Sequence, residues 1–163
     1  MTLRHSLFDK IFMSFLVIFT VCFGFIVLYA SNVTKNMLVD ERTEVLTNEA
    51  FLIADQTVTG YIQGVYTEDD LQKSLRYYSD TLNASIWVTD EKGIIYGFAN
   101  AKGHPDNPKN IFLINPDFDI DTAQSFNGSF FDTFDGDVIS VAIPIRTNNQ
   151  PNGMLLIHST VEQ

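Results

Sequence analysis

Apolar residues dominate the first part of the chain. Ile11 to Ala30 is a run of 20 residues without a charged side chain. A helix rises about 1.5 Å per residue, so this run would span about 30 Å, the thickness of the hydrocarbon core of a bilayer. The buried helix of a soluble domain would show a polar stripe, whereas only Ser14 and Thr20 are polar here. The pattern predicts a transmembrane helix over residues 11–30.

The charges beside this run predict its orientation. Arg4 and Lys10 precede it, and positively charged residues favour the cytoplasmic side of a membrane. We therefore expect a cytoplasmic tail over residues 1–10. Lys35 and Arg42 follow the run and count against this orientation. A cleaved signal peptide is the alternative to an anchor, although its apolar region usually has only about 7–15 residues.

Two helical patterns follow the predicted span. Between Ser31 and Gln63, apolar residues recur at helical spacing: Leu38, Val45, Leu46, Ala50, Leu52, Ile53 and Val58. This stripe predicts a long helix whose second half packs on a sheet, because it barely reaches the three or four heptads that a coiled coil needs. A second amphipathic helix is predicted over Glu68 to Leu82, and Thr67 with Asp70 resembles a capping box at its start.

The remaining patterns predict strands separated by turn residues. Five runs are rich in β-branched and aromatic residues, namely Ser85–Thr89, Ile94–Phe98, Ser129–Phe134, Asp137–Ile145 and Met154–Thr160. Three of the four connections are short, which favours one antiparallel sheet. The predicted fold class is α+β, with an N-terminal transmembrane helix and with a long and a short helix packed on a five-stranded antiparallel sheet. The last two strands are almost continuously apolar, which indicates a sheet covered on both faces.

Composition narrows the classes of function. The chain has 20 acidic and 10 basic residues, a net charge of −10, which disfavours binding to nucleic acids. Cys22 is the only cysteine, so the chain can form neither an intrachain disulfide nor a cysteine-based zinc site. The sequence contains no glycine-rich phosphate loop and no G-x-S-x-G nucleophile motif. We therefore expect no catalytic residues and no cofactor in this chain.

A long irregular segment, Ala99 to Asn127, is available to cover the second face of the sheet. Its prolines and glycine break regular structure, and such a segment packs less completely than a helix. We predict a small-molecule or cation site between this segment and the sheet. The candidate contacts are Trp87, Tyr96, Phe98, His104 and Ser140. The alternative is that these aromatic residues form ordinary core, as His158 is expected to do.

An acidic motif, Asp117-Phe118-Asp119-Ile120-Asp121, invites comparison with a calcium loop. An EF-hand loop that begins at Asp117 would need glycine at its sixth position and glutamate at its twelfth, and the chain has Thr122 and Gly128 there. We therefore favour a solvated acidic edge with Phe118 and Ile120 turned inward. Asp117, Asp119 and Asp121 are left only as weak metal candidates, part of a surface that attracts cations.

The order of these elements resembles a known family. The run N-A-S-I-W-V-T-D-E-K-G-I-I-Y after two helices, and S-V-A-I-P-I followed by a turn and G-M-L-L-I-H-S, resemble the extracytoplasmic PAS-like, or single-Cache, sensor region of bacterial membrane sensor histidine kinases. The resemblance implies a sensor domain over residues 31–163 outside the cell membrane. In such kinases a second transmembrane span, a HAMP-type linker and a kinase core follow. We expect this chain to be the input part of such a two-component protein, which would be a homodimer.

Two other interpretations stay open. The same input region would suit a chemoreceptor or a nucleotide cyclase, and only the output domain separates these classes from a kinase. A membrane-anchored surface binding protein that transmits no signal is the second alternative. The reading frame beyond Gln163 distinguishes all of them.

Overall fold

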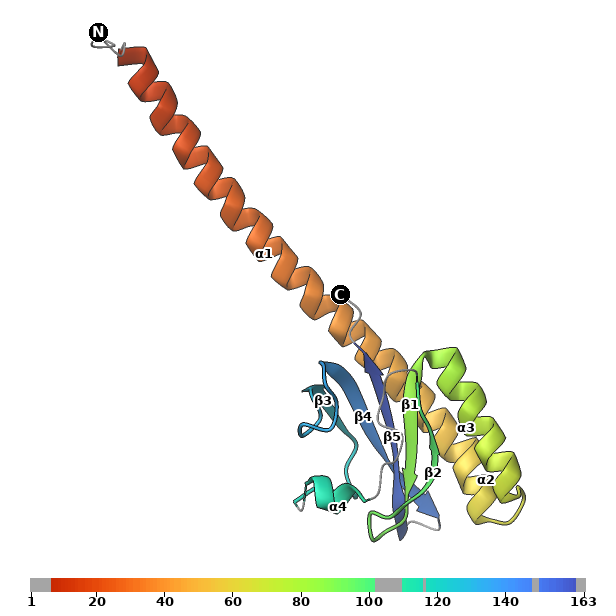
Figure 1. Cartoon of the computed structure of the whole chain (residues 1–163). Helices are drawn as coiled ribbons and strands as arrows, with labels where there is room; N and C mark the ends of the chain where they lie inside the picture. Colours follow the sequence, from red (N-terminus) through yellow and green to blue (C-terminus); the bar gives the residue numbers. More distant parts are fainter. Residues whose placement is uncertain (1–6, 102–109, 116, 148–149, 161–163) are drawn as a thin grey trace. The chain divides into compact units, whose positions relative to one another are not determined.

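A computed structural model describes residues 7–101, 110–115, 117–147 and 150–160. The chain divides into two compact units, Met1–Asp40 and Glu41–Gln163. Helix α1, Leu7–Leu52, is 46 residues long and begins in the first unit (Figure 1). The predicted helix at 11–30 is therefore present as part of a longer helix.

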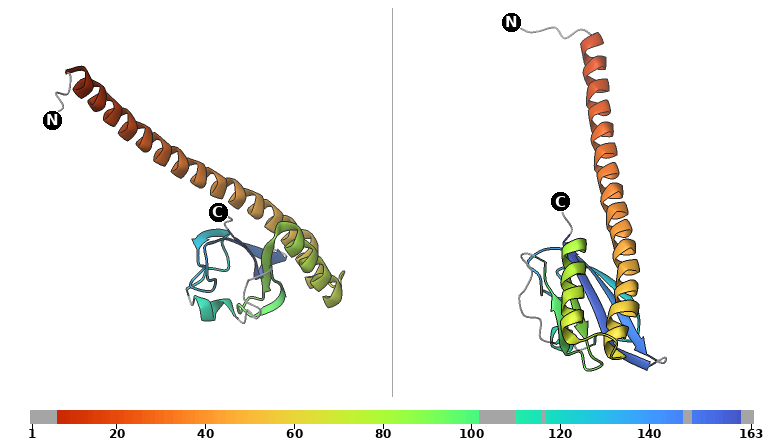
Figure 2. Two further views of the ribbon diagram at one scale, coloured as in Figure 1. Left: turned by 45° about the horizontal axis from the view of Figure 1, so that its top comes forward. Right: turned by 90° about the vertical axis from the view of Figure 1, so that its right-hand side faces the viewer.

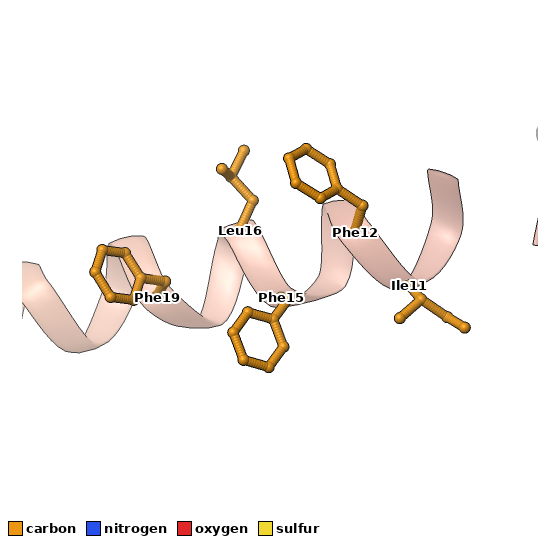
Figure 3. Close-up of a pocket in the computed structure, with 5 residues that line it drawn as sticks. All are labelled: Ile11, Phe12, Phe15, Leu16 and Phe19. Atoms are coloured by element: carbon orange, nitrogen blue, oxygen red, sulfur yellow. The ribbon is translucent and has the colours of Figure 1, made fainter. Parts of the chain in front are cut away.

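The first unit consists of the N-terminal part of α1. This helix is long and apolar enough to cross a membrane, and its side chains in the predicted span are exposed. Thr20 donates its hydroxyl to Leu16 O at 2.8 Å, which satisfies that polar group within the helix. Figure 3 shows Ile11, Phe12, Phe15, Leu16 and Phe19 projecting from this helix. The hollow between them, about 300 Å³, has only apolar lining and suits contact with hydrocarbon chains better than a polar ligand.

The second unit contains one antiparallel sheet in the order β2-β1-β5-β4-β3. The strands are β1 Ala84–Thr89, β2 Ile95–Ala99, β3 Gln124–Gly128, β4 Val138–Thr147 and β5 Gln150–Thr160. β4 and β5 form the long central hairpin, in which Ser140 pairs with His158 and Ile143 with Leu155. Sheet type and strand number confirm the α+β prediction, and the burial of β4 and β5 along most of their length confirms a sheet covered on both faces.

Helices cover one face of the sheet, here called the helix face (Figure 2). After Leu52, α1 passes into a π-helical segment η1, Ile53–Val58, and then α2, Thr59–Ile62; η1 packs on β4. The wider π turn was not predicted, and the Thr59 hydroxyl supports it by donating to Ala54 O at 2.9 Å. Helix α3, Glu68–Leu82, packs on β1 and β2.

The predicted start of α3 is confirmed in detail. Thr67 accepts a hydrogen bond from Asp70 N, and the Asp70 carboxylate accepts one from Thr67 N, so the capping box is complete. The Thr67 hydroxyl also donates to Asp70, and these bonds lower the pKa of Asp70. Asn83 ends the helix in the left-handed conformation, which a short polar side chain tolerates.

The other face, here called the loop face, is covered by described residues between β2 and β4. A short helix α4, Ile111–Ile114, and the turns around β3 lie on it (Figure 1). Its core includes Trp87, Ile111, Phe118, Phe130, Phe134, Val138, Ala142, Met154 and Leu156. Phe118 is buried and Ile120 packs against this core, which confirms that both side chains of the acidic motif turn inward.

The predicted third strand was wrong. Residues 129–134 form turns, and the strand that pairs with β4 is Gln124–Gly128, where Phe126 lies opposite Ser140. Phe130, Phe131 and Asp132 have φ values of 46°, 55° and 59°, a left-handed conformation that cannot continue a strand. Phe130 and Phe134 enter the core from this turn, whereas Phe131 is exposed.

Candidate functional site

An imidazole surrounded by aromatic rings lies at the centre of the loop face. His158 of β5 is fully buried, and its Nδ1 lies 2.8 Å from the Ser140 hydroxyl on β4. Ring centroids of Trp87, Phe130 and Phe134 lie 4.3, 4.4 and 4.9 Å from that of His158. We call these five residues the histidine cluster. The Ser140–His158 bond follows from strand register, because the two residues are direct partners in the β4–β5 pair.

The turn after β3 supplies two rings of the histidine cluster. The amide groups of Thr133 and Phe134 both donate to Ser129 O, at 3.1 and 3.0 Å, and the Ser129 hydroxyl accepts from Asp132 N at 3.3 Å. These bonds hold a single left-handed turn. Each left-handed residue other than glycine costs about 1–2 kcal/mol, and burial of the Phe130 and Phe134 rings offsets that cost.

Trp87 is held from its polar edge as well as from its faces. Its indole N–H donates to the Asn100 side-chain carbonyl at 3.0 Å, and its ring stacks on Phe134 with centroids 5.7 Å apart. The Ser85 hydroxyl accepts from Ala101 N at 3.0 Å. Two side chains of β1, Ser85 and Trp87, thus bind the two residues that follow β2.

The structure brings together only some of the predicted contacts. Trp87 and Ser140 both touch His158, whereas Phe98 pairs with Trp87 across the strands and is partly exposed. Tyr96 lies elsewhere, because a β-bulge turns it to the helix side, where it stacks on Tyr61. His104 lies outside the described residues. Whether Trp87, Phe98, His104 or Ser140 contacts a ligand stays a prediction.

Sequence reasoning gave no role in a site to Phe130, Phe134 or His158. His158 was expected to be an ordinary core residue. Its pairing with Ser140 depends on the register of β4 and β5, which is shifted by a bulge between Ile145 and Arg146. Phe130 and Phe134 were assigned to a strand. A run of aromatic residues next to Asp and Gly was the only signal for a turn there.

The acidic motif is organised by its own hydrogen bonds. The Asp119 carboxylate accepts from Asp121 N at 2.8 Å and from the Thr122 hydroxyl, and these bonds lower its pKa. Arg146 donates to Asp121 O at 2.7 Å. Within the described residues, no three His, Cys, Asp or Glu side chains lie close enough together to hold a metal ion. The weak metal candidates therefore form a turn in this structure.

Sequence comparison and structural comparison give different results. No family model matches the chain, and no curated protein sequence matches it. Among solved structures, the sensory domain of the Campylobacter jejuni chemoreceptor Tlp3 (CcmL) with isoleucine bound is similar at a TM-score of 0.57 and 15% identity, over 78% of this chain and 55% of that one. The sensor domain of the V. cholerae histidine kinase DctB is similar at a TM-score of 0.55 and 12% identity, over 83% and 57%.

The chain has the fold of these two sensor domains. The resemblance inferred from the sequence is thereby confirmed at the level of fold, since identities this low carry no more than that. The chain spans only a little over half the length of these neighbours, 55% of the Tlp3 domain and 57% of the DctB domain.

Proposed function

We propose that this chain is the extracytoplasmic signal-sensing input domain of a two-component sensor histidine kinase, and that it relays a conformational change through its membrane-proximal helix. The continuity of α1 carries the proposal. One helix holds the apolar residues 11–30 and also Leu46 and Ala50, which are fully buried in the second unit. A change in the packing of this helix is carried along a continuous hydrogen-bonded backbone.

Arg42 supports the relay, because it connects α1 to two other elements of its unit. Its guanidinium donates to Leu82 O at the end of α3 (2.7 Å) and to the Ser159 hydroxyl near the end of β5 (3.2 Å). Ser159 follows His158 directly, and successive side chains of a strand point to opposite faces. A rearrangement of the histidine cluster therefore reaches α1 through one strand and one arginine.

The membrane arrangement belongs to the same proposal. Residues 1–10 are cytoplasmic, residues 11–30 span the membrane and residues 31–163 lie outside. The positions of Arg4 and Lys10 support this orientation. The full-length protein is a homodimer, because anchoring in a membrane raises the effective concentration of two copies without new contacts. A reporter enzyme active only outside the cytoplasm, fused after Gln163, tests the orientation.

The signal is a small molecule bound on the loop face. The similar Tlp3 structures contain isoleucine and L-valine, which are small ligands with an apolar side chain. The histidine cluster offers Trp87, Phe130 and Phe134 and includes no Lys, Arg, Asp or Glu. An uncharged part of a ligand suits such an apolar environment.

A chemoreceptor input domain is the second candidate, because Tlp3 is a chemoreceptor. The reading frame that follows residue 163 decides between the two. A second apolar span, a linker and a kinase core support the proposal. A chemoreceptor signalling domain or a cyclase domain contradicts the kinase assignment, and a frame without any output domain favours the surface binding protein.

A hybrid receptor tests signal sensing itself. Residues 1–163 are fused to the second span, linker and kinase core of a characterised sensor kinase, and autophosphorylation is measured against a panel of amino acids and other small metabolites. We expect at least one compound to change the phosphorylation rate, and Trp87→Ala to remove the response. A response that Trp87→Ala leaves unchanged would exclude the loop face as the sensing site.

A further inference from the structure

A second hollow lies on the helix side of the sheet, away from the histidine cluster. Its lining comes from four elements: Tyr61 and Ile62 of α2, Glu68 of α3, Tyr96 of β2 and Asn152 of β5. Its volume is about 390 Å³, within the range of about 300–1,000 Å³ that small-molecule sites occupy. We call it the tyrosine hollow.

A β-bulge aims Tyr96 into the tyrosine hollow. Val88 pairs with Gly97 and Thr89 pairs with Ile95, so Tyr96 is the extra residue between two paired positions. A bulge re-aims a side chain, and here the Tyr96 ring stacks on Tyr61 with centroids 6.0 Å apart and planes 27° apart. Ile95 packs against the core of the loop face instead.

A close approach of two strands holds the backbone beside Asn152, another lining residue. The next residue, Gly153, has a φ of +131°, and a Cβ there would lie 1.8 Å from Thr89 O. Only glycine allows β5 to pass so near β1. Met154 N also donates to the Thr89 hydroxyl at 3.1 Å. These two contacts with Thr89 therefore hold the part of β5 next to Asn152.

Among the described lining residues, Glu68 is the only charged one. The next two acidic residues already have partners. Asp69 forms an ion pair with Lys73 at 2.5 Å, and Asp70 forms the capping box with Thr67. Within the described residues, no ion pair engages Glu68. Among the residues that the structure describes, no Lys, Arg or His lines the hollow, and the chain as a whole has a net charge of −10. The electrostatic environment therefore favours a cation.

The tyrosine pair is suited to a cation that carries apolar groups. Burial first, then the neighbouring Tyr61 and Asp90, raises the pKa of Tyr96 to about 12, so its hydroxyl stays neutral at physiological pH. The faces of aromatic rings attract ammonium groups. A calcium ion would need six to eight oxygen ligands, which one carboxylate, one amide and two phenols do not provide.

We propose that the tyrosine hollow binds a small organic ammonium ion, with its charged head against the Tyr61 and Tyr96 rings and Glu68 as counter-ion. The Asn152 side chain offers a further polar contact. This site is distinct from the loop face, and its existence does not rest on the proposed signalling role. Binding is therefore measured directly and not through a signalling response.

The test uses the full chain in nanodiscs of phosphatidylglycerol, a lipid without a choline head group. Choline is titrated by calorimetry, with empty nanodiscs as reference, and compared with its uncharged isostere, in which a quaternary carbon replaces the nitrogen. We expect saturable choline binding and at least about tenfold weaker binding of the isostere. Equal binding of the two probes, or no saturable binding of choline at about 50 mM, well above a Kd of about 1 mM, overturns the proposal.

Matched variants locate the bound cation. Tyr61→Ala should weaken choline binding about tenfold and Glu68→Gln about threefold, while Tyr61→Phe, which keeps the ring face, should stay near wild type. Tyr77→Ala and Asp80→Asn are the controls, because both residues are exposed on α3 and do not line the hollow. If Tyr61→Ala does not fold, Glu68→Gln decides, since Glu68 is exposed. Unchanged affinity in Glu68→Gln, or equal losses in the controls, contradicts the proposal.

Discussion

The two faces of the sheet are both buried, but different kinds of structure cover them. On the helix face, α3 and η1 contribute aliphatic residues such as Leu71, Leu75 and Val58. On the loop face, turns place aromatic rings around a histidine. A regular helix satisfies its own backbone hydrogen bonds, whereas the turn at 129–134 depends on three consecutive left-handed residues.

This difference indicates which face can rearrange. Cooperative units with regular hydrogen bonding open rarely, and elements that move in binding come from the less stable part of a structure. Strained backbone often marks such a region. The loop face has both a strained turn and the buried polar pair Ser140 and His158. We therefore expect the helix face to set stability and the loop face to respond to a ligand.

The largest loss of stability should come from a truncation on the helix face. Leu75 is fully buried and packs beside Gly97 of β2. Leu75→Ala should lower the free energy of unfolding by about 3 kcal/mol, since a helix cannot collapse into the cavity. Trp87 is the only tryptophan, so its fluorescence during urea denaturation in detergent reports the change. A loss of stability smaller than that caused by Phe134→Ala on the loop face would contradict the view that the helix face sets stability.

A matched truncation on the loop face should lower the free energy of unfolding by less. Phe134→Ala removes a ring that stacks on Trp87, and Phe→Ala in a core usually costs about 3–5 kcal/mol. We expect about 2 kcal/mol here, because the turn that carries Phe134 can relax from its left-handed conformation. The same denaturation gives the value, and near-ultraviolet dichroism should show an altered Trp87 environment. A cost above that of Leu75→Ala would mean that the turn is as rigid as the helices.

Arg42 links the helix face to the end of β5, so its loss should affect coupling more than folding. Arg42→Ala removes two hydrogen bonds and should lower the free energy of unfolding by about 1–2 kcal/mol. In the hybrid receptor it should abolish the response while ligand affinity stays unchanged. Arg76→Ala, an exposed arginine on α3, is the control. A normal response in Arg42→Ala would exclude this residue from the relay.

The smallest loss of stability should come from a change at the start of α3. Thr67→Ala removes the capping box and should cost about 1 kcal/mol. The Thr67 bonds lower the pKa of Asp70, so the ionised carboxylate stabilises the fold above the pKa of the unfolded chain, about 3.9. That contribution is lost as pH falls through the lower folded-state pKa. In Thr67→Ala the pKa of Asp70, followed by NMR, should rise toward its ordinary value. An unchanged pKa would show that Thr67 does not hold the carboxylate.

Local patterns were predicted well because their causes lie within a few residues. Thr67 and Asp70 are three positions apart, and their side chains reach each other within one helical turn, so the bounds of α3 are confirmed. The apolar run at 11–30 needs no partner to form a helix. The burial of β4 and β5 on both faces was visible in their continuous apolar runs.

Prediction failed where one residue's position depends on distant strands. Tyr96 was expected to contact a ligand between the irregular segment and the sheet, but a bulge in the β1–β2 pairing turns it to the helix side. The run Ser129–Phe134 has the composition of a strand, yet Gln124–Gly128 takes that place in the sheet. Composition measures how well a side chain suits a pleated surface, and register decides which residue occupies it.

The sequence by itself determined an apolar helix long enough to cross a membrane, the two amphipathic helices, the antiparallel sheet class and the resemblance to a sensor domain, because these follow from periodicity, charge and order along the chain. The tertiary structure decided which residues form the histidine cluster and the tyrosine hollow. His158 meets Ser140 only through the register of β4 and β5, and Tyr96 meets Tyr61 only through a bulge. Both pairs are separated by many residues, and contacts of that kind are selected by the packing of the whole sheet.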